Sequence, residues 1–158
     1  MSNNTKIYLA TDEQLNTLEP QFEAMYKHYY SANGLTRLSD GGFARWCKNY
    51  HRARGLSRVI YIAEINGLIA GFVEGQILIN PHAVNPEKKG HIAHLFVLPD
   101  FRRQGTASEL HSTVQEWFVK KSVQSETLEV VFQNSIADAF WTARGFQPIF
   151  VKYYRNFA

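Results

Sequence analysis

The segment VLPDFRRQGTASEL, residues 97–110, leads from the end of a predicted strand into the start of a predicted helix. Arg102, Arg103 and Gly105 stand just before that helix. The first backbone N–H groups of a helix lack intrahelical partners, and the helix dipole adds partial positive charge at the same end. Arginine side chains there supply further charge-assisted donors. The segment therefore predicts an anion site, and a phosphate is the anion that we expect.

Length and composition favour one globular domain over residues 1–158. Of the 158 residues, 45% are hydrophobic and 20% are charged, which are ordinary values for a packed domain. The single cysteine, Cys47, excludes an internal disulfide and favours a reducing compartment. The N-terminus is too polar for a secretory signal, and no apolar run approaches the ~20 residues of a membrane helix. We therefore expect a cytoplasmic protein with no membrane partner.

The charge of the chain indicates the class of partner. A formal net charge of +3 is small, and the basic residues form no continuous face with a nucleic-acid-binding motif. We expect no nucleic-acid partner, whereas one polyanionic small molecule would suit this charge. No metal is expected, because the side chains that could ligate one lack the usual spacing. They are Cys47, His28, His51, His82 and His111.

Hydrophobic periodicity predicts strands at residues 6–10, 59–64, 68–79, 91–97, 125–133 and 146–157, and helices at residues 12–33, 40–50, 105–121 and 134–143. Pro20 is expected to kink or split the first helix. Asn66-Gly67 is typical of a two-residue hairpin turn, and residues 80–90 form a polar loop. Helices alternate with strands only in the second half, so we expect a mixed sheet that begins antiparallel and becomes parallel.

The anion-binding segment is similar to a known family motif. It lacks the Gly-Lys-Ser/Thr of a Walker loop and the three glycines of a dinucleotide fingerprint. It resembles the pyrophosphate-binding segment of the GNAT superfamily of acyl-CoA-dependent N-acyltransferases. That segment reads Gln/Arg-x-x-Gly-x-Gly/Ala after a strand that ends Val-x-Pro. The matching residues here are Val97, Pro99, Arg102, Gly105 and Ala107.

A second segment, NSIADAFWTARGF at residues 134–146, resembles a later motif of the same family. In that motif an asparagine opens a helix, here Asn134, and an aromatic pair precedes Gly-Phe. The hairpin AEINGLIAGFVEG, residues 63–75, also resembles the family's second and third strands. The resemblance covers about residues 60–154, with both motifs in the family's order.

The resemblance implies a fold and an acyl donor. The fold is α/β, with a mixed, mostly antiparallel central sheet, helices on both faces and a splay between strands 4 and 5. The donor is acetyl-CoA, whose pantothenate arm lies in the splay and whose pyrophosphate lies on the glycine-containing segment. The implied cofactor-binding residues are Leu95, Phe96, Val97, Arg102, Arg103, Gln104, Gly105, Thr106, Ala107, Ser108, Asn134 and Trp141.

The implied reaction is direct attack of an amine on the thioester carbon. An ammonium must first lose a proton, so a general base is expected. The resemblance makes His91 and Glu129 candidates, because relatives carry a base at those positions. His94 is a third candidate, which strand alternation places on the opposite face from His91.

Trp141 departs from the family pattern. Relatives carry a tyrosine there whose hydroxyl protonates the departing thiolate, whereas an indole N–H supplies no proton at neutral pH. Tyr153 or Tyr154 on the expected last strand could replace it, and Tyr154 is our choice. The same departure motivates an alternative function, an acyl-CoA-binding sensor with weak catalysis.

The acceptor is expected to lie against the first two helices. Tyr26, Tyr30 and Glu74 are the candidate binding residues, because aromatic rings and carboxylates suit a cationic amine. Aromatic residues at helical spacing also build cores, so packing is the competing interpretation. We expect a small-molecule amine first and a protein N-terminus or lysine second, with a homodimer as the assembly.

Overall fold

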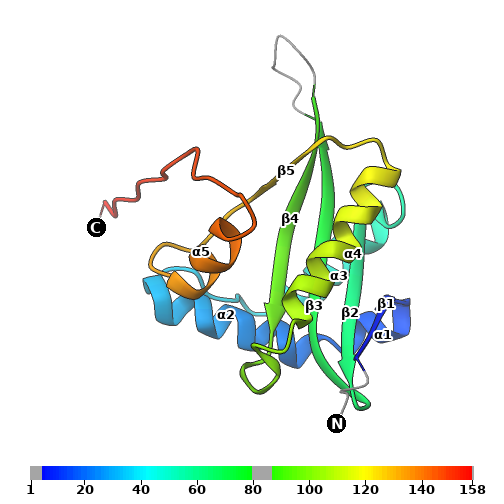
Figure 1. Cartoon of the computed structure of the whole chain (residues 1–158). Coiled ribbons are helices and arrows are strands. Elements are labelled where there is room, and N and C mark those ends of the chain that lie inside the picture. The colour runs from blue at the N-terminus through cyan, green and yellow to red at the C-terminus, as the bar shows by residue number, and fades with distance from the viewer. Residues whose placement is uncertain (1–4, 80–86, 158) are drawn as a thin grey trace.

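The computed structural model describes residues 5–79 and 87–157, and Figure 1 shows an open sheet with helices on both faces. The strands are β1 (Thr5–Leu9), β2 (Arg58–Ile65), β3 (Leu68–Ile79), β4 (Lys88–Val97) and β5 (Ser125–Leu128). The helices are α1 (Asp12–Asn16), α2 (Glu19–Asn33), α3 (Gly42–Ala53), α4 (Thr106–Lys120) and α5 (Ser135–Thr142), with a 3-10 turn at Pro99–Phe101. The expected α/β fold class is confirmed.

The sheet follows the order of the chain, β1-β2-β3-β4-β5. The first four strands pair antiparallel, and β5 pairs parallel to β4 after the crossover through α4. Asn66 and Gly67 have φ of 52° and 82°, as a type I′ hairpin turn requires, so the predicted turn is confirmed. Residues 80–86, with His82 and most of the expected polar loop, lie outside the described residues.

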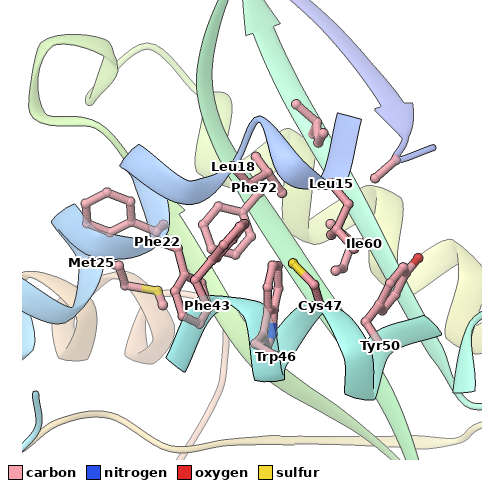
Figure 2. Close-up of a cluster of buried hydrophobic side chains, with 13 residues drawn as sticks. Leu15, Leu18, Phe22, Met25, Phe43, Trp46, Cys47, Tyr50, Ile60 and Phe72 are labelled. Carbon is pink, nitrogen blue, oxygen red and sulfur yellow. The ribbon is translucent and has the colours of Figure 1, made fainter. Parts of the chain in front are cut away.

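Two hydrophobic clusters fill the two sides of the sheet. On the side that we call the α2/α3 face, Phe22, Trp46 and Phe72 pack with neighbours from three helices and the sheet. Figure 2 shows these rings pointing toward one another. On the opposite side, the α4/α5 face, Val114 and Trp141 pack against the sheet. The site described below lies where these two layers meet the free edge of β4.

The first predicted helix is split in two. A capping box closes the start of α1, with Thr11 accepting from the backbone of Gln14 and Gln14 reaching back. Helix α2 begins at Glu19 with Pro20 in its first turn, where a proline costs no hydrogen bond. The expectation that Pro20 kinks or splits the helix is confirmed as a split.

A β-bulge at Ala93 changes which way the β4 side chains point. Glu74 pairs with His94 while Gly75 pairs with Ile92, so Ala93 has no partner residue on β3. Ile92 packs into the α4/α5 cluster, whereas His94 contacts rings of the α2/α3 cluster. Neighbouring side chains of a strand point to opposite faces, so His91, next to Ile92, points to the α2/α3 face, as His94 does. The expectation that the two histidines face opposite ways is wrong, because it assumed unbroken alternation.

The end of the chain differs from the prediction. Strand β5 ends at Leu128 rather than residue 133, because the backbone turns there and Asn134 N donates to Val131 O. Residues 146–157, expected as a last strand, form neither helix nor strand and extend away beyond α5 (Figure 1). A strand needs an edge to pair with, and composition alone does not provide one.

Among the helices of residues 5–79 and 87–157, none has the length and apolar character that crossing a bilayer requires.

Candidate active site

The edge of β4 that faces away from β3 is open over half its length. Pairing with β5 stops at Ile92 and Leu128, and the described chain has no further strand beside β4 up to Val97. Leu98 N donates to Ala70 O at 2.8 Å, so in this antiparallel ladder the N–H groups of Leu95 and Val97 point to the open side. This opening is the expected splay, and two backbone donors line it.

The start of α4 lies beside that opening. Gly105 is the N-cap residue with φ of 88°, and no side chain of the described residues caps the helix. The first intrahelical bond runs from Glu109 N to Gly105 O, so the N–H groups before it have no helical acceptor. The Thr106 hydroxyl is buried, with no hydrogen-bond partner among the described residues. These donors form a site that suits a phosphate.

Arginines surround the start of α4. Arg102 Nε donates to Val97 O at 2.8 Å, and its guanidinium lies 5.6 Å from the Phe96 ring centre, which ties the loop to the end of β4. Arg144 donates to the Ser108 hydroxyl in the first turn of α4. Arg144 was not among the residues predicted to bind the cofactor. In the sequence it is marked only as a basic residue directly before Gly145, which follows α5.

Two residues of the later motif hold α5 in place. Asn134 Oδ1 accepts from Ala137 N at 3.3 Å and caps the helix, which leaves its Nδ2 as the donor for other groups. Trp141 is only 7% exposed, with its ring centres 5.2 Å from both His111 and Phe146. Contacts of Asn134 and Trp141 with a cofactor stay predictions.

A buried carboxylate is the centre of the α2/α3 face. Glu74 has no exposed surface, and donors from four elements reach its two oxygens. Trp46 Nε1 and His94 Nδ1 lie 2.7 Å from Oε2, and Arg58 Nε and Gln76 Nε2 lie 2.8 Å and 2.9 Å from Oε1. Burial would raise the pKa of Glu74, but the hydrogen bond and charge of His94, the charge of Arg58 and the Gln76 amide lower it to about 2. Glu74 is therefore ionised at neutral pH.

Aromatic side chains surround His94 beside this carboxylate. Its ring centre lies 5.5 Å from Phe22 and 6.3 Å from Tyr26, with Trp46 meeting it edge-on at 6.1 Å. Its side chain keeps 14% exposure. The ring is thus held by packing on several sides and still reaches solvent.

His91 lies on the same face, nearer β5. Its Nδ1 is 3.1 Å from Thr127 Oγ1, and that hydroxyl donates to Gly90 O at 3.2 Å. Burial lowers the pKa of His91, while the charges of Glu129 and Glu74 act against that change. The fold therefore brings Glu129 and His94 close enough to His91 for their charges to affect its pKa.

A hollow of about 830 Å³ opens between α2 and the segment before α3. Tyr26 and Tyr30, both predicted to bind the acceptor, line it together with Glu23 and Asp40. Tyr26 also lies against His94, so one side chain joins the hollow to the histidine. Glu74 lies beneath this surface, fully buried, with an oxygen 2.7 Å from His94 Nδ1.

Tyr154 belongs to the C-terminal segment, where it is 68% exposed, and Figure 1 shows that segment leading away from β4. Its role as a proton donor stays a prediction.

Comparisons with known proteins agree with this arrangement. The model of the acetyltransferase (GNAT) family matches residues 7–146. Aminoglycoside N(6')-acetyltransferase type 1 of Salmonella typhimurium is 29% identical over 90 residues, which are 55% of this chain and 61% of the relative. The match thus spans less than two thirds of that relative's length.

Solved structures share the fold. An aminoglycoside N-acetyltransferase in complex with CoA is 20% identical with a TM-score of 0.73, covering 100% of this chain and 98% of that chain. Ribosomal-protein-alanine N-acetyltransferase from Brucella melitensis biovar Abortus 2308 is 17% identical with a TM-score of 0.72, covering 97% and 99%.

Proposed function

Because the chain belongs to the acetyltransferase (GNAT) family, we propose that it transfers an acetyl group from acetyl-CoA to the primary amine of a small molecule. The observation that carries this proposal is the open edge of β4 leading directly to the uncapped start of α4. The buried, unpartnered hydroxyl of Thr106 and the surrounding arginines fit a pyrophosphate. Acetyl-CoA supplies the activated acetyl thioester.

The backbone of β4 has two tasks in this proposal. Leu95 and Val97, whose N–H groups point into the opening, bind the extended arm as an added strand would. The N–H of Val97 donates to the thioester oxygen as negative charge develops on it. Phe96 contributes through its ring, which packs on Arg102. Asn134 donates its Nδ2 to the arm from the α5 side.

The acceptor lies in the aromatic hollow with its amine toward β4. Tyr26 and Tyr30 attract a cation. The charged residues that line the hollow are acidic in excess, with Glu19, Glu23 and Asp40 against Lys27 and Arg37. The relative from Salmonella typhimurium is named for aminoglycosides, which are cationic amines, and this supports a small-molecule acceptor. A peptide amine is the second candidate, because one structural neighbour is named for a ribosomal protein.

The expected result of a direct test is thiol release from acetyl-CoA with one class of amine. Calorimetry first establishes that acetyl-CoA binds. Release is then measured against polyamines, aminoglycosides, amino acids and basic peptides. Release with a small amine supports the proposal, and release with peptides alone moves the acceptor to proteins. Binding without release across the panel would favour an acyl-CoA sensor, and failure to bind would exclude both.

We also propose that the chain forms a homodimer and works in the cytoplasm. The buried single Cys47 suits a reducing compartment. Large hydrophobic side chains are exposed along residues 147–157, a composition that favours a strand but finds no partner strand in the described chain. They are Ile149, Phe150, Val151, Tyr153, Tyr154 and Phe157. A second copy would cover them.

Light scattering after size exclusion tests the dimer. We expect the native chain to have twice the monomer mass, and Phe150→Asp with Tyr153→Asp to have the mass of one chain. Leu56→Asp is the matched control, because Leu56 is 78% exposed but lies between α3 and β2. A native chain that stays monomeric at micromolar concentration, or a dimer indifferent to the double change, would contradict the proposal.

A further inference from the structure

We propose that His94 is the general base for the acceptor amine and that Glu74 is the positioning residue that holds it. This inference rests on the proposed function and chooses among the candidate bases. It starts from one contact, in which His94 Nδ1 lies 2.7 Å from Glu74 Oε2. A carboxylate accepts from a protonated ring nitrogen, so Nδ1 carries the hydrogen and the lone pair lies on Nε2. The ring is thereby set to take a proton at Nε2.

Three donors besides His94 hold the Glu74 carboxylate. Trp46 of α3, Arg58 of β2 and Gln76 of β3 all donate to it, and it has no exposed surface. An apolar residue of similar size is often as stabilising in such a position as a buried ion pair. A fixed, ionised carboxylate does provide something that an apolar residue cannot. It stabilises the imidazolium that forms when His94 accepts a proton.

The location of His94 suits this task. The bulge at Ala93 turns it to the α2/α3 face, directly before Leu95, whose N–H points into the opening. Tyr26 connects it to the acceptor hollow. His94 therefore lies between the place proposed for the acceptor and the place proposed for the thioester.

His91 has a weaker arrangement for the same task. Its Nδ1 partner is the neutral hydroxyl of Thr127, which gives no charge to stabilise an imidazolium. The ionisable groups around the Glu74–His94 pair are Arg58 on β2, His91 on β4, Tyr26 on α2, Tyr50 on α3 and, beyond His91, Glu129 after β5. Glu74 itself bonds His94 directly.

The proton balance is closed without another reactant. Nε2 of His94 takes one proton from the ammonium, and the neutral nitrogen forms a bond to the thioester carbon as the carbon–sulfur bond breaks. The nitrogen then gives up a second proton. One of the two protons ends on the departing sulfur and the other in solvent, which returns His94 to its neutral form.

The test is the pH profile of kcat/KM in the full chain. With native protein we expect the rate to fall at low pH, where His94 is protonated and has no lone pair for the ammonium proton. His94→Asn should lower the rate about 100-fold and remove that low-pH fall. The dissociation constant of acetyl-CoA, measured by calorimetry, should change less than about threefold. His51→Asn is the control, because His51 is exposed on α3 and pairs with Asp12 outside the site.

Two further variants distinguish positioning from simple packing. Glu74→Gln should lower the rate and move the fall of the pH profile to lower pH, because the imidazolium loses its carboxylate. Should that variant fold poorly, His94→Ala supplies the second measurement, and added imidazole should restore part of its rate. A low-pH fall that survives in His94→Asn but disappears in His91→Asn would overturn the proposal. Failure of the native chain to turn over would instead remove the proposed function.

Discussion

Gly105→Val should raise the dissociation constant for acetyl-CoA about 100-fold, a loss of about 2.7 kcal/mol. Gly105 has φ of 88°, which a β-branched residue adopts only with strain. An added Cβ would meet nothing closer than Glu109 Oε1 at 3.9 Å, so packing within the protein is not the obstacle. Relief of the strain moves the uncapped N–H groups at the start of α4. They then no longer converge on the phosphates, so acetyl-CoA binds more weakly.

Gly34→Val is the matched control for this change. Gly34 caps the end of α2 with φ of 68°, and an added Cβ there also meets nothing within 4 Å. Both variants should lose about 1–2 kcal/mol of unfolding free energy in urea, and only Gly105→Val should lose affinity by calorimetry. Equal affinities in the two variants would mean that the start of α4 is not the phosphate site.

Local signals in the sequence predicted the elements that depend on few neighbours. Asn66-Gly67 specifies its turn through backbone conformations that those two residues tolerate. Asn134 caps α5 with its own side chain, and Pro20 sits in the first turn of α2. Each of these features involves residues within four positions of one another, so a single sequence contains the necessary information.

Features that depend on pairing were not predictable in the same way. The bulge at Ala93 exists only in the register between β3 and β4, and it decides that His91 and His94 share a face. The last predicted strand had the right composition, but no edge in the described chain pairs with residues 146–157. Composition favours a strand, whereas the partner decides whether it forms.

The Glu74 network shows the same limit at the site. The sequence singled out Glu74 as a residue that contacts the acceptor, but the fold buries it beneath the surface. Its partners Trp46, Arg58 and His94 come from separate elements, 28, 16 and 20 positions away. No spacing rule connects them, so only the packed sheet and α3 reveal that the carboxylate contacts a histidine.

Replacing Glu74 should lower the free energy of unfolding more than any of the other substitutions. Glu74→Gln leaves the Arg58 guanidinium, on a side chain that is 15% exposed, without its carboxylate, and removing one partner of a buried pair costs about 3–5 kcal/mol. We expect that loss in the unfolding free energy at pH 7, measured in urea. Glu64→Gln is the control, because Glu64 is half-buried and, within residues 5–79 and 87–157, accepts from the Tyr8 hydroxyl alone; it should lose less than about 1 kcal/mol.

The dependence of this loss on pH identifies its cause. The pKa of Glu74 is about 2 in the folded chain against 4.5 as its ordinary value, so the unfolded chain binds the proton first as the pH falls. The contribution of Glu74 is therefore complete above pH 4.5 and declines toward pH 2. The gap between native protein and Glu74→Gln should narrow across that interval, provided both remain two-state in urea. A gap that stays constant from pH 7 to pH 3 would mean that lost packing, rather than the buried carboxylate, accounts for the difference.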